Sequence, residues 1–349
     1  MINEFTTCVV CGKPVPAGRK TCSPECRSMR QRQVSLARWQ SSGNKFTLSP
    51  DAIDIMHQYV DTHSNILQHL IAAILDRIGY IYEFDYCLNG IQYDIAVPSI
   101  KTVICADASV NVVAYRDVTN NLYSHKLDGY NITLNATQQG WRCIHWYDWD
   151  DIFQLPLLIS RSRSIYARDC EVQEISKSES DIFLNMYHLQ KVRRGSKCSL
   201  GLFYRGNLVQ VMSFGYPWFN KHYEWELYRF CSDPEYRIVG GVSKLFKHFI
   251  QLENPESIIT YCDTSKFSGD SYIKAGMTFR SRTAPSIIWS KGTDKMPTNI
   301  LTRFSYDGMF GTNYGPEVNS YELMILNGWL PVYNCGQYTY EWHKPTPCI

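Results

Sequence analysis

Two adjacent glycines in the C-terminal third of the chain could form an anion site. Gly240 and Gly241 follow a β-rich stretch and precede Ser243 and Lys244, where an amphipathic helix begins. Successive glycines admit the positive φ angles that align backbone N–H groups at a helix N-terminus, where phosphates and oxyanions bind. We expect a phosphate or acyl oxyanion here, held by Arg229, Arg237, Gly240, Gly241, Ser243 and Lys244. A plain strand-to-helix turn is the alternative for a lone pair of glycines.

Groups suited to proton transfer follow the next predicted strand, Ile258–Tyr261. Asp263, Ser268 and Tyr272 come after that strand, where a general base or acid would face a substrate. Ser268 could equally cap a helix that begins near Asp270. The sequence therefore predicts catalytic roles for these three side chains, with a structural role as the alternative for Ser268.

A histidine ends an earlier predicted helix, Asp181–Gln190. The apolar spacing of that helix places Ile182, Met186 and Leu189 on one side. His188 then either faces the acyl acceptor or has a structural role at the helix end.

The stretch that carries these groups resembles the GCN5-related N-acetyltransferase (GNAT) fold. Arg237–Val242 lies close to the pyrophosphate motif of that fold, Arg/Gln-x-x-Gly-x-Gly/Ala, although Val242 stands where Gly or Ala is usual. A closer resemblance is to the GNAT-like domains of phage proteins, namely the Mom DNA-modification family and homing-endonuclease-like (Hef-like) proteins. The matching residues include Tyr187–Gln190, Glu226–Phe230, Gly240-Gly241, Ser243-Lys244, Tyr261, Asp263, Ser268-Gly269, Tyr272, Gly276, Glu322, Met324, Gly328-Trp329 and Cys335-Gly336.

This resemblance implies a mixed-sheet domain over residues 170–349. Such folds bind their donor where two central strands splay, with the acceptor on the opposite side. The implied donor is an acyl-CoA or another acyl donor.

Four cysteines close to the N-terminus have the spacing of a metal site. Cys8 and Cys11 form one pair, and Cys22 and Cys26 form a second pair about ten residues further on. Four thiolates at this spacing can converge tetrahedrally on a structural Zn²⁺. Residues 1–45 resemble the short zinc fingers that are attached to phage nucleases.

Basic side chains cluster beside these cysteines. Residues 12–45 hold eight Lys or Arg against one acid, Glu25. We expect phosphate contacts with double-stranded DNA, and a solvated basic face is the alternative. The side chains expected to contact DNA are Arg19, Lys20, Arg27, Arg30, Arg32 and Arg38.

The middle of the chain, residues 46–165, has the predicted order helix, three strands, helix, strand. The helical stretches are Ser49–Asp54 with His63–Ile78 and Tyr130–Gln139, and the strands are Tyr80–Phe84, Gln92–Val97, Thr102–Asp107 and Gly140–Trp149. This order resembles the PD-(D/E)xK nucleases, in their very-short-patch-repair (Vsr) branch.

The nuclease motif of that family is incomplete. Asp94 matches its first metal-binding Asp, but the next strand carries Cys105, a soft thiol unsuited to Mg²⁺. Asp107 lies on the same strand face as Cys105 and could substitute. The family's later His and Lys positions fall on Asp128–Ile132, which supplies neither, although His125-Lys126 lies slightly upstream. We expect a degenerate nuclease domain kept as a DNA-binding scaffold, which binds Mg²⁺ only if Asp94 and Asp107 are active.

Composition narrows the class of protein. A net charge of +2 over 349 residues excludes a histone-like polycation, so nucleic-acid affinity must come from local patches. Thirteen cysteines, an odd number, favour reduced thiols and a metal site over a disulfide framework. Because there is no apolar run of about 20 residues and no signal peptide, we expect no membrane partner and a cytoplasmic location, in the host cell if the protein is phage-encoded.

Together the sequence predicts an α/β (α+β) protein with a zinc knuckle, a nuclease-like mixed sheet and a GNAT-like mixed sheet. The leading functional hypothesis is a phage-type transferase that moves an acyl or related group to a DNA base amine. The second is Mg²⁺-dependent DNA cleavage of the homing-endonuclease kind, and the third is DNA binding without catalysis. The sequence leaves the oligomeric state open.

Overall fold

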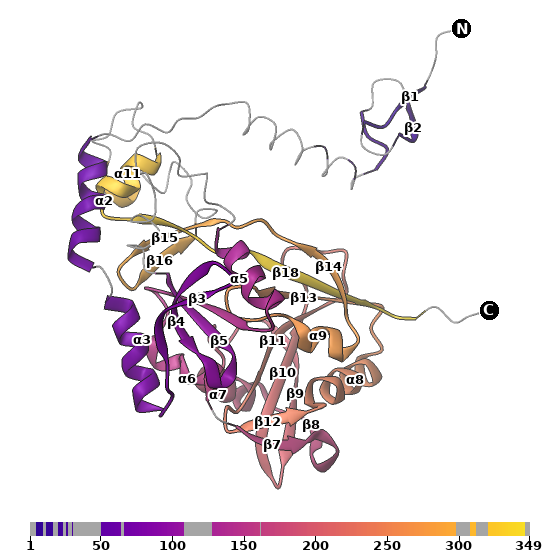
Figure 1. The fold of residues 1–349 in the computed structure, drawn as a ribbon. Coiled ribbons are helices and arrows are strands. Elements are labelled where there is room, and N and C mark those ends of the chain that lie inside the picture. Colours follow the sequence, from indigo (N-terminus) through magenta and orange to yellow (C-terminus); the bar gives the residue numbers. More distant parts are fainter. Residues whose placement is uncertain are drawn as a thin grey trace. The chain divides into compact units, whose positions relative to one another are not determined.

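A computed structural model of the chain describes residues 5–9, 12–16, 20–23, 26, 30, 50–63, 66–107, 128–160, 162–297, 308–311 and 320–345. The chain divides into two compact units, Met1–Thr47 with Thr119–Leu122, and the remainder. The fold is of the mixed α+β class, as predicted (Figure 1). Among the described residues, no helix is both long and apolar enough to cross a membrane.

The small N-terminal unit is a two-stranded antiparallel hairpin. β1 (Phe5–Thr7) pairs with β2 (Pro14–Pro16), and the chain between them turns tightly. Cys8 donates its N–H to Lys13 O at 2.7 Å, and Gly12, at φ 73°, donates to Cys8 O at 2.9 Å. These two hydrogen bonds hold Lys13 and Gly12 close to the backbone of Cys8.

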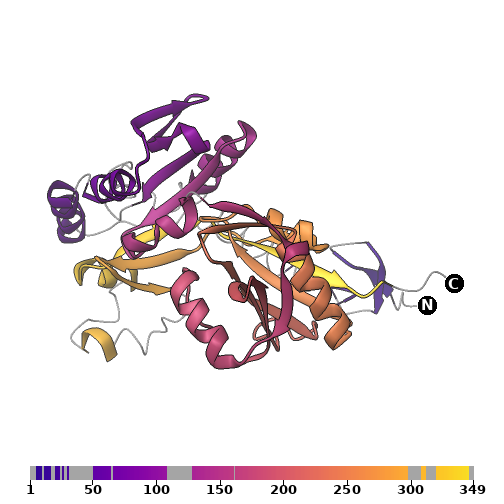
Figure 2. The same cartoon turned by 90° about the horizontal axis from the view of Figure 1, so that it is seen from below.

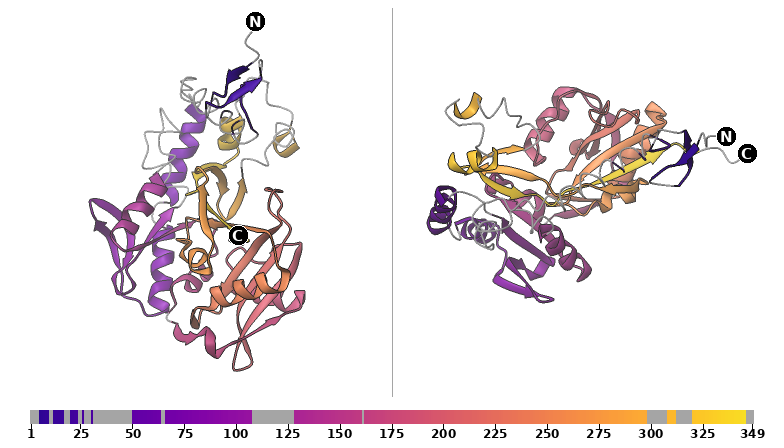
Figure 3. Two further views of the ribbon diagram at one scale, coloured as in Figure 1. Left: turned by 90° about the vertical axis from the view of Figure 1, so that its right-hand side faces the viewer. Right: turned by 90° about the horizontal axis from the view of Figure 1, so that it is seen from above.

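A four-stranded sheet opens the large unit. Its order is β3 (Glu83–Leu88), β4 (Ile91–Val97), β5 (Thr102–Asp107) and β6 (Arg142–Tyr147). β5 and β6 run parallel, because α5 (Asp128–Gln138) lies between them in the chain. The preceding helices α2 (Pro50–His63) and α3 (Ile66–Arg77) follow one another beside this sheet (Figure 3). The predicted order of helix, three strands, helix and strand is confirmed.

A seven-stranded sheet forms the second layer of the large unit. Its order is β14 (Thr278–Arg282), β18 (Gln337–His343), β13 (Ser257–Asp263), β11 (Trp225–Ser232), β10 (Asn207–Gly215), β9 (Ser196–Tyr204) and β8 (Glu171–Glu174). Within this sheet only β11 and β13 pair in parallel; the other neighbours are antiparallel. Figure 2 shows the two sheets as separate layers of the large unit.

The central strands of this sheet separate soon after they pair. The β11 to β13 ladder contains only Trp225 opposite Ile258 and Glu226 opposite Ile259. Beyond that point β11 continues against β10 as far as Ser232, and β13 continues against β18 as far as Asp263. The strands therefore splay toward their C-terminal ends, as the GNAT resemblance implies.

Helix α8 (Gly241–Glu253) covers one face of the seven-stranded sheet. Its buried side chains, Leu245, Phe246 and Phe249, recur at helical spacing. Phe249 stacks on Phe214 of β10 and meets the edge of Trp225. This apolar layer fixes the start of the helix beside the splayed strands.

The predicted helix at residues 181–190 was wrong in its start and in its end. α7 (Lys177–Tyr187) begins four residues earlier, because Ser176 and Glu179 form a reciprocal capping box. Ile182 and Met186 are 62% and 58% exposed, whereas Phe183 and Leu184 are buried. Leu189 lies beyond the end of the helix.

An insertion between β14 and β18 reaches helix α2, which precedes the four-stranded sheet. It forms a small sheet of β15 (Ile287–Lys291), β16 (Asp294–Pro297) and β17 (Leu330–Tyr333). Helix α11 (Ser320–Leu326) of the same insertion contacts α2 (Figure 1). The two predicted halves of the large unit are thus joined through this insertion.

A buried lysine connects the two sheets. Lys266, 5% exposed, lies after β13 and places its ammonium 2.5 Å from Asp150 Oδ2. The same ammonium donates to the backbone carbonyl of His145 on β6 and lies 4.4 Å from the ring centroid of Trp146. His145 N–H in turn donates to Ser265 O at 2.8 Å. A charge in this position is tolerated because it is paired and hydrogen-bonded.

We predict that Lys266→Met lowers the free energy of unfolding by about 3–5 kcal/mol, because it leaves the Asp150 carboxylate without its cation. Urea denaturation followed by fluorescence measures this loss. The matched control is Lys344→Met, which removes an ion pair to Glu256 at the surface and should cost less than about 1 kcal/mol. Equal losses in the two variants would contradict the role assigned to Lys266.

Candidate functional site

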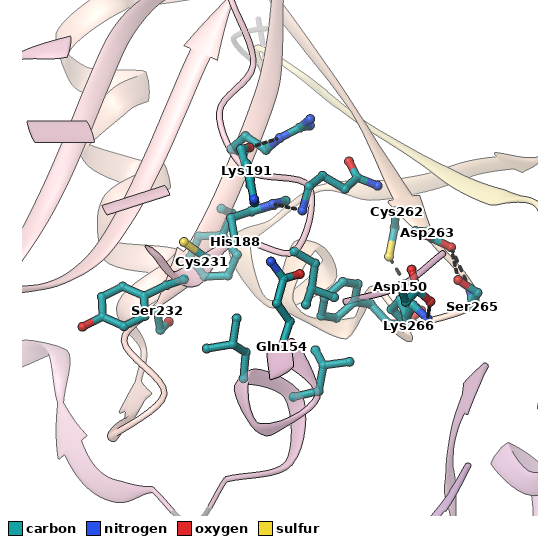
Figure 4. Close-up of a pocket in the computed structure, with 18 of the residues that line it drawn as sticks. Asp150, Gln154, His188, Lys191, Cys231, Ser232, Cys262, Asp263, Ser265 and Lys266 are labelled. Carbon is teal, nitrogen blue, oxygen red and sulfur yellow. Dashed lines mark hydrogen bonds and ion pairs between the residues drawn. The ribbon is translucent and has the colours of Figure 1, made fainter. Parts of the chain in front are cut away.

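A cleft of about 910 Å³ opens where β11 and β13 separate. One wall comes from the seven-stranded sheet and the end of α7. The other comes from the segment after β6, including η2 (Ile152–Gln154) and α6 (Pro156–Ile159). In Figure 4, His188 and Cys231 lie toward one end, and Asp150, Asp263, Ser265 and Lys266 lie toward the other. The cleft is thus built from both halves of the large unit.

Asp263 ends β13 and lines the cleft. Its Oδ1 accepts from the N–H of Ser265 at 3.0 Å and from the hydroxyl of Ser265 at 2.6 Å. These two donors fix the carboxylate orientation (Figure 4). Among the described residues, no hydrogen bond is formed by Oδ2, so one oxygen is available to accept a proton.

Tyr272 and Ser268 occupy different surroundings. Tyr272, on α9 (Asp270–Ala275), lines the cleft, and burial holds the pKa of its hydroxyl well above its usual range. The hydroxyl is therefore protonated at neutral pH and can act as a proton donor. Ser268 is absent from the cleft wall; it is exposed, and its Oγ accepts from Asp270 N at 3.5 Å. The N-cap residue of α9 is Gly269, and no side chain caps this helix, so the structure supports neither the catalytic role nor the capping role predicted for Ser268.

His188 lies at the C-terminal end of α7 and lines the cleft. Burial and the neighbouring Arg229 cation lower the pKa of the imidazole to about 3. The neutral ring accepts a hydrogen bond at Nδ1 from Gln190 N–H, at 3.0 Å. The ring proton is then on Nε2, so His188 is a hydrogen-bond donor in this arrangement rather than a base.

The lowered pKa of His188 predicts a pH effect on stability. Because the imidazole is neutral when folded but protonates near pH 6.5 when unfolded, its contribution is present above that pH and is lost as pH falls toward about 3. We expect His188→Asn to reduce the slope of unfolding free energy against pH by about 1.4 kcal/mol per unit between about pH 6 and 4.

Urea titrations at a series of pH values would measure that slope. His222→Asn, at an exposed histidine outside the cleft, is the matched control. Parallel pH profiles for the wild type and the His188 variant would contradict the assignment.

Two arginines of the predicted anion site, Arg229 and Arg237, line the cleft. Arg229 is held by the carbonyl of Lys191, which accepts from Nε at 3.0 Å, and by the carbonyl of Tyr228, which accepts from Nη1 at 2.9 Å. Arg237, on β12 (Tyr236–Val239), is exposed. Both cations are therefore positioned at the cleft wall, one fixed by backbone carbonyls and one facing solvent.

The glycine turn adjoins the cleft lining without being part of it. Gly240 caps α8 at φ 82°, in the left-handed region that glycine favours. A Cβ on Gly241 would lie 2.3 Å from Gln210 Oε1, so that position requires glycine for packing. The space beside Gly241 is therefore occupied by the Gln210 side chain and not by a ligand.

The polar residues after the turn have partners within the fold. Ser243 donates its hydroxyl to Lys274 O at 2.6 Å. The ammonium of Lys244 donates to Ala167 O at 2.9 Å and to Cys170 O at 2.5 Å. The Lys244 contacts anchor η3 (Ala167–Asp169) and Cys170 beside the turn, and the Ser243 contact joins the turn to α9. Neither residue lines the cleft.

A buried ion pair that sequence reasoning missed lies where the strands separate. Glu226 is 1% exposed, and Arg193 contacts its Oε1 while placing Nη2 3.4 Å from Oε2. The guanidinium also lies 4.0 Å from the ring centroid of Tyr228. Glu226 is the last β11 residue paired with β13, so this ion pair supports the point of separation. A Glu in the middle of an apolar strand was the available signal.

The two predicted nuclease acids lie on neighbouring strands of the four-stranded sheet. Burial raises the pKa of Asp94 to about 6, and its Oδ2 accepts from Ala106 N at 2.8 Å. Asp107 accepts a close hydrogen bond from His145 Nδ1. Each carboxylate is therefore already engaged by the protein.

A buried cluster beside these acids was only partly anticipated. Cys105 Sγ lies 3.8 Å from Cys143 Sγ, and Cys143 Sγ lies 3.6 Å from His145 Nε2. All three residues are at most 5% exposed. Cys143 and His145 were missed, although their alternation on a predicted buried strand was a signal for a shared face.

The cluster is electrostatically coupled. The hydrogen bond from Cys105 lowers the pKa of Cys143 to about 5, and the same contact together with burial raises the pKa of Cys105. Burial alone would lower the pKa of His145, but Cys335, Asp107 and Cys143 raise it well above its usual value. The arrangement favours negative charge on sulfur beside an imidazole.

In the small unit, three of the four predicted metal ligands come together. The Sγ atoms of Cys8, Cys22 and Cys26 all lie within 4.8 Å of one another, and Cys26 N donates to Ser23 Oγ at 3.2 Å. Cys11, Arg19, Arg27, Arg32 and Arg38 lie outside the described residues, as do His125 and Lys126. Lys20 is exposed and Arg30 is partly buried.

Comparison with known proteins gives structural neighbours only. No protein-family model matches the chain, and no curated protein matches it. A putative acetyltransferase from Salmonella typhimurium, with acetyl-CoA, is 12% identical, at TM-score 0.30, over 52% of this chain and 99% of that one. An N-acetyltransferase from Staphylococcus aureus Mu50 is 14% identical, at TM-score 0.28, over 50% and 98%.

A putative streptothricin acetyltransferase from Bacillus anthracis, also in complex with acetyl coenzyme A, is 10% identical, at TM-score 0.25, over 50% of this chain and 70% of that one. At TM-scores and sequence identities this low, the similarity carries no information about the substrate of this protein. The strand order of the seven-stranded sheet and the separation of its parallel pair define the fold.

Proposed function

We propose that this protein is a DNA-modifying transferase of the phage type, which moves an acyl or related group to a base amine in the cleft between its two sheets. One observation carries the proposal. The parallel pairing of β11 and β13 stops after two residues, and Asp263, Tyr272, His188 and Arg229 all line the space that opens there.

The cleft has residues suited to hold an acyl-CoA. Its volume, about 910 Å³, lies within the range of small-molecule sites. Arg229 and Arg237 would hold phosphate oxygens, since guanidinium groups bind them in a bidentate manner. When bound, such a donor supplies a thioester carbonyl that an amine can attack.

The protein's own residues would manage the protons. Asp263, held at Oδ1 by Ser265, would take the proton that the amine loses, through Oδ2. Tyr272, which is protonated at neutral pH, would donate its hydroxyl proton to the leaving sulfur as the C–S bond breaks and the C–N bond to the amine forms. His188 would donate from Nε2 to a carbonyl or base oxygen.

The part of the cleft near Trp149 has groups that would bind a planar base on a negatively charged chain. Trp149 lines the cleft and stacks on Tyr147, with ring centroids 4.5 Å apart and planes 15° from parallel. Lys295 lies 5.8 Å from the Trp149 ring centroid. Aromatic faces with nearby cations suit an unstacked base and its phosphates. The cysteines of the small unit, with zinc, and its basic residues would bring double-stranded DNA to the protein.

DNA cleavage with Mg²⁺ receives less support from the geometry. Asp94 and Asp107 each accept a hydrogen bond within the protein. Cys105, whose soft thiol is a poor ligand for Mg²⁺, lies two residues before Asp107 on β5. Asp94→Ala would abolish cleavage if this second function were correct. DNA binding with neither modification nor cleavage would favour the third reading.

We predict that genomic DNA from cells expressing the wild type contains a modified nucleoside that is absent or strongly reduced with Asp263→Asn. Loss of general base catalysis should lower the rate by about 10²- to 10⁴-fold. Digestion of the DNA followed by nucleoside mass spectrometry measures the adduct. An unmodified nucleoside profile with the wild type would overturn the proposal.

We also predict that Tyr272→Phe lowers the rate by about 10- to 10³-fold while retaining the fold, because only the donor hydroxyl is removed. The matched control is Tyr338→Phe, on β18 and outside the cleft wall. Adduct yield at equal protein levels would be compared. Equal losses in the two tyrosine variants would contradict a catalytic role for Tyr272.

A further inference from the structure

We propose that Cys105, Cys143 and His145 bind a zinc ion inside the four-stranded sheet, at a site distinct from the N-terminal cysteines. The three side chains come from the parallel strands β5 and β6. Their donor atoms, two Sγ and one Nε2, all lie within 4.8 Å of one another.

The distances between the donor atoms fit tetrahedral zinc. With Zn–S of about 2.3 Å and Zn–N of about 2.05 Å, tetrahedral angles place two sulfurs about 3.8 Å apart and a sulfur and a nitrogen about 3.6 Å apart. The structure has Cys105 Sγ to Cys143 Sγ at 3.8 Å and Cys143 Sγ to His145 Nε2 at 3.6 Å. Two of the three pairs of donor atoms therefore have the spacing that the ion requires, and the third pair lies within 4.8 Å.

The histidine is oriented as metal-binding histidines are. His145 donates through Nδ1 to Asp107, which leaves Nε2, 3.6 Å from Cys143 Sγ, as the nitrogen that can bind the ion. A carboxylate on the far nitrogen fixes the ring and raises its basicity as a ligand. Asp107 therefore positions the His145 ligand through a hydrogen bond. The carboxylate that was expected to bind Mg²⁺ directly would not contact the zinc ion.

The ligand types select the metal. Two thiolates and an imidazole are soft or borderline donors, which suit Zn²⁺ and not Mg²⁺. The Thr133 hydroxyl, 2.7 Å from Nε2, already donates its proton to Gly129 O, so it accepts from Nε2–H in this state. Zinc binding would release the Nε2 proton of His145. A water molecule or the Thr133 hydroxyl oxygen would then be the fourth ligand.

Burial makes the site part of the folded core. His145 is 0% exposed, Cys105 4% and Cys143 5%. Such an ion is acquired as the domain folds, and its binding energy becomes folding energy. Because His145 N–H donates to Ser265 O, the ion would also stiffen the segment that carries Asp263.

The test measures zinc in purified full-length protein by mass spectrometry. In Cys8→Ser/Cys22→Ser, which removes two ligands of the small unit, we expect about one zinc per chain to remain. Adding Cys143→Ser should remove it, whereas adding Cys262→Ser, at a buried thiol outside the cluster, should not. No zinc in the double variant, or equal zinc in the two triple variants, would overturn the proposal.

A second measurement does not depend on folding of the Cys143 variant. Cobalt(II) added to the refolded double variant should give sulfur-to-metal charge-transfer absorption and the visible bands of tetrahedral cobalt, at about one equivalent per chain. Absence of these bands would contradict the site. So would a disulfide between Cys105 and Cys143, detected by peptide mapping of the purified wild type without reductant.

Discussion

The turn Asp263–Lys266 is the constraint on which the large unit depends. Lys266 carries a charge into the interior and is paired there with Asp150 and the carbonyl of His145. Thr264 Oγ1 donates to Cys335 O and Gly336 O on the other side, at 2.9 and 2.8 Å. A turn held from both sides fixes the Asp263 carboxylate relative to both sheets, and the cleft forms around it.

This constraint also explains why the two sheets form one compact unit. The end of β13, the strand β6 and the insertion that carries Cys335 meet at the same place, and Tyr147 Oη lies 3.6 Å from Cys335 Sγ. The four-stranded sheet, with the zinc ion proposed for it, would supply rigidity on one side of the cleft. The transferase-like sheet would supply the chemistry on the other.

The sequence predicts the local elements well because they follow from short-range patterns. Strand alternation and turn residues locate β4 and β5 to within about one residue. The start of α7 was missed because the Ser176 to Glu179 capping box was overlooked. The apolar spacing of Ile182 and Met186 did not indicate the buried side, because tertiary packing buries Phe183 and Leu184 instead. Lys266 could not be anticipated, because its partners Asp150 and His145 are more than a hundred residues away in the chain. Cys105 was interpreted as a replaced metal-binding acid of a nuclease motif. Its neighbour Cys143 is distant in the chain and is brought close only by the pairing of β5 with β6.

The most direct test of the central claim is hydrogen–deuterium exchange of the full-length protein with and without acetyl-CoA. If the separated strands hold the donor, exchange should slow at the end of β11, near Arg229–Ser232, and from Asp263 to Tyr272, and it should be unchanged in β3 and β4. Unchanged exchange throughout, or protection confined to the four-stranded sheet, would contradict a transferase site in this cleft.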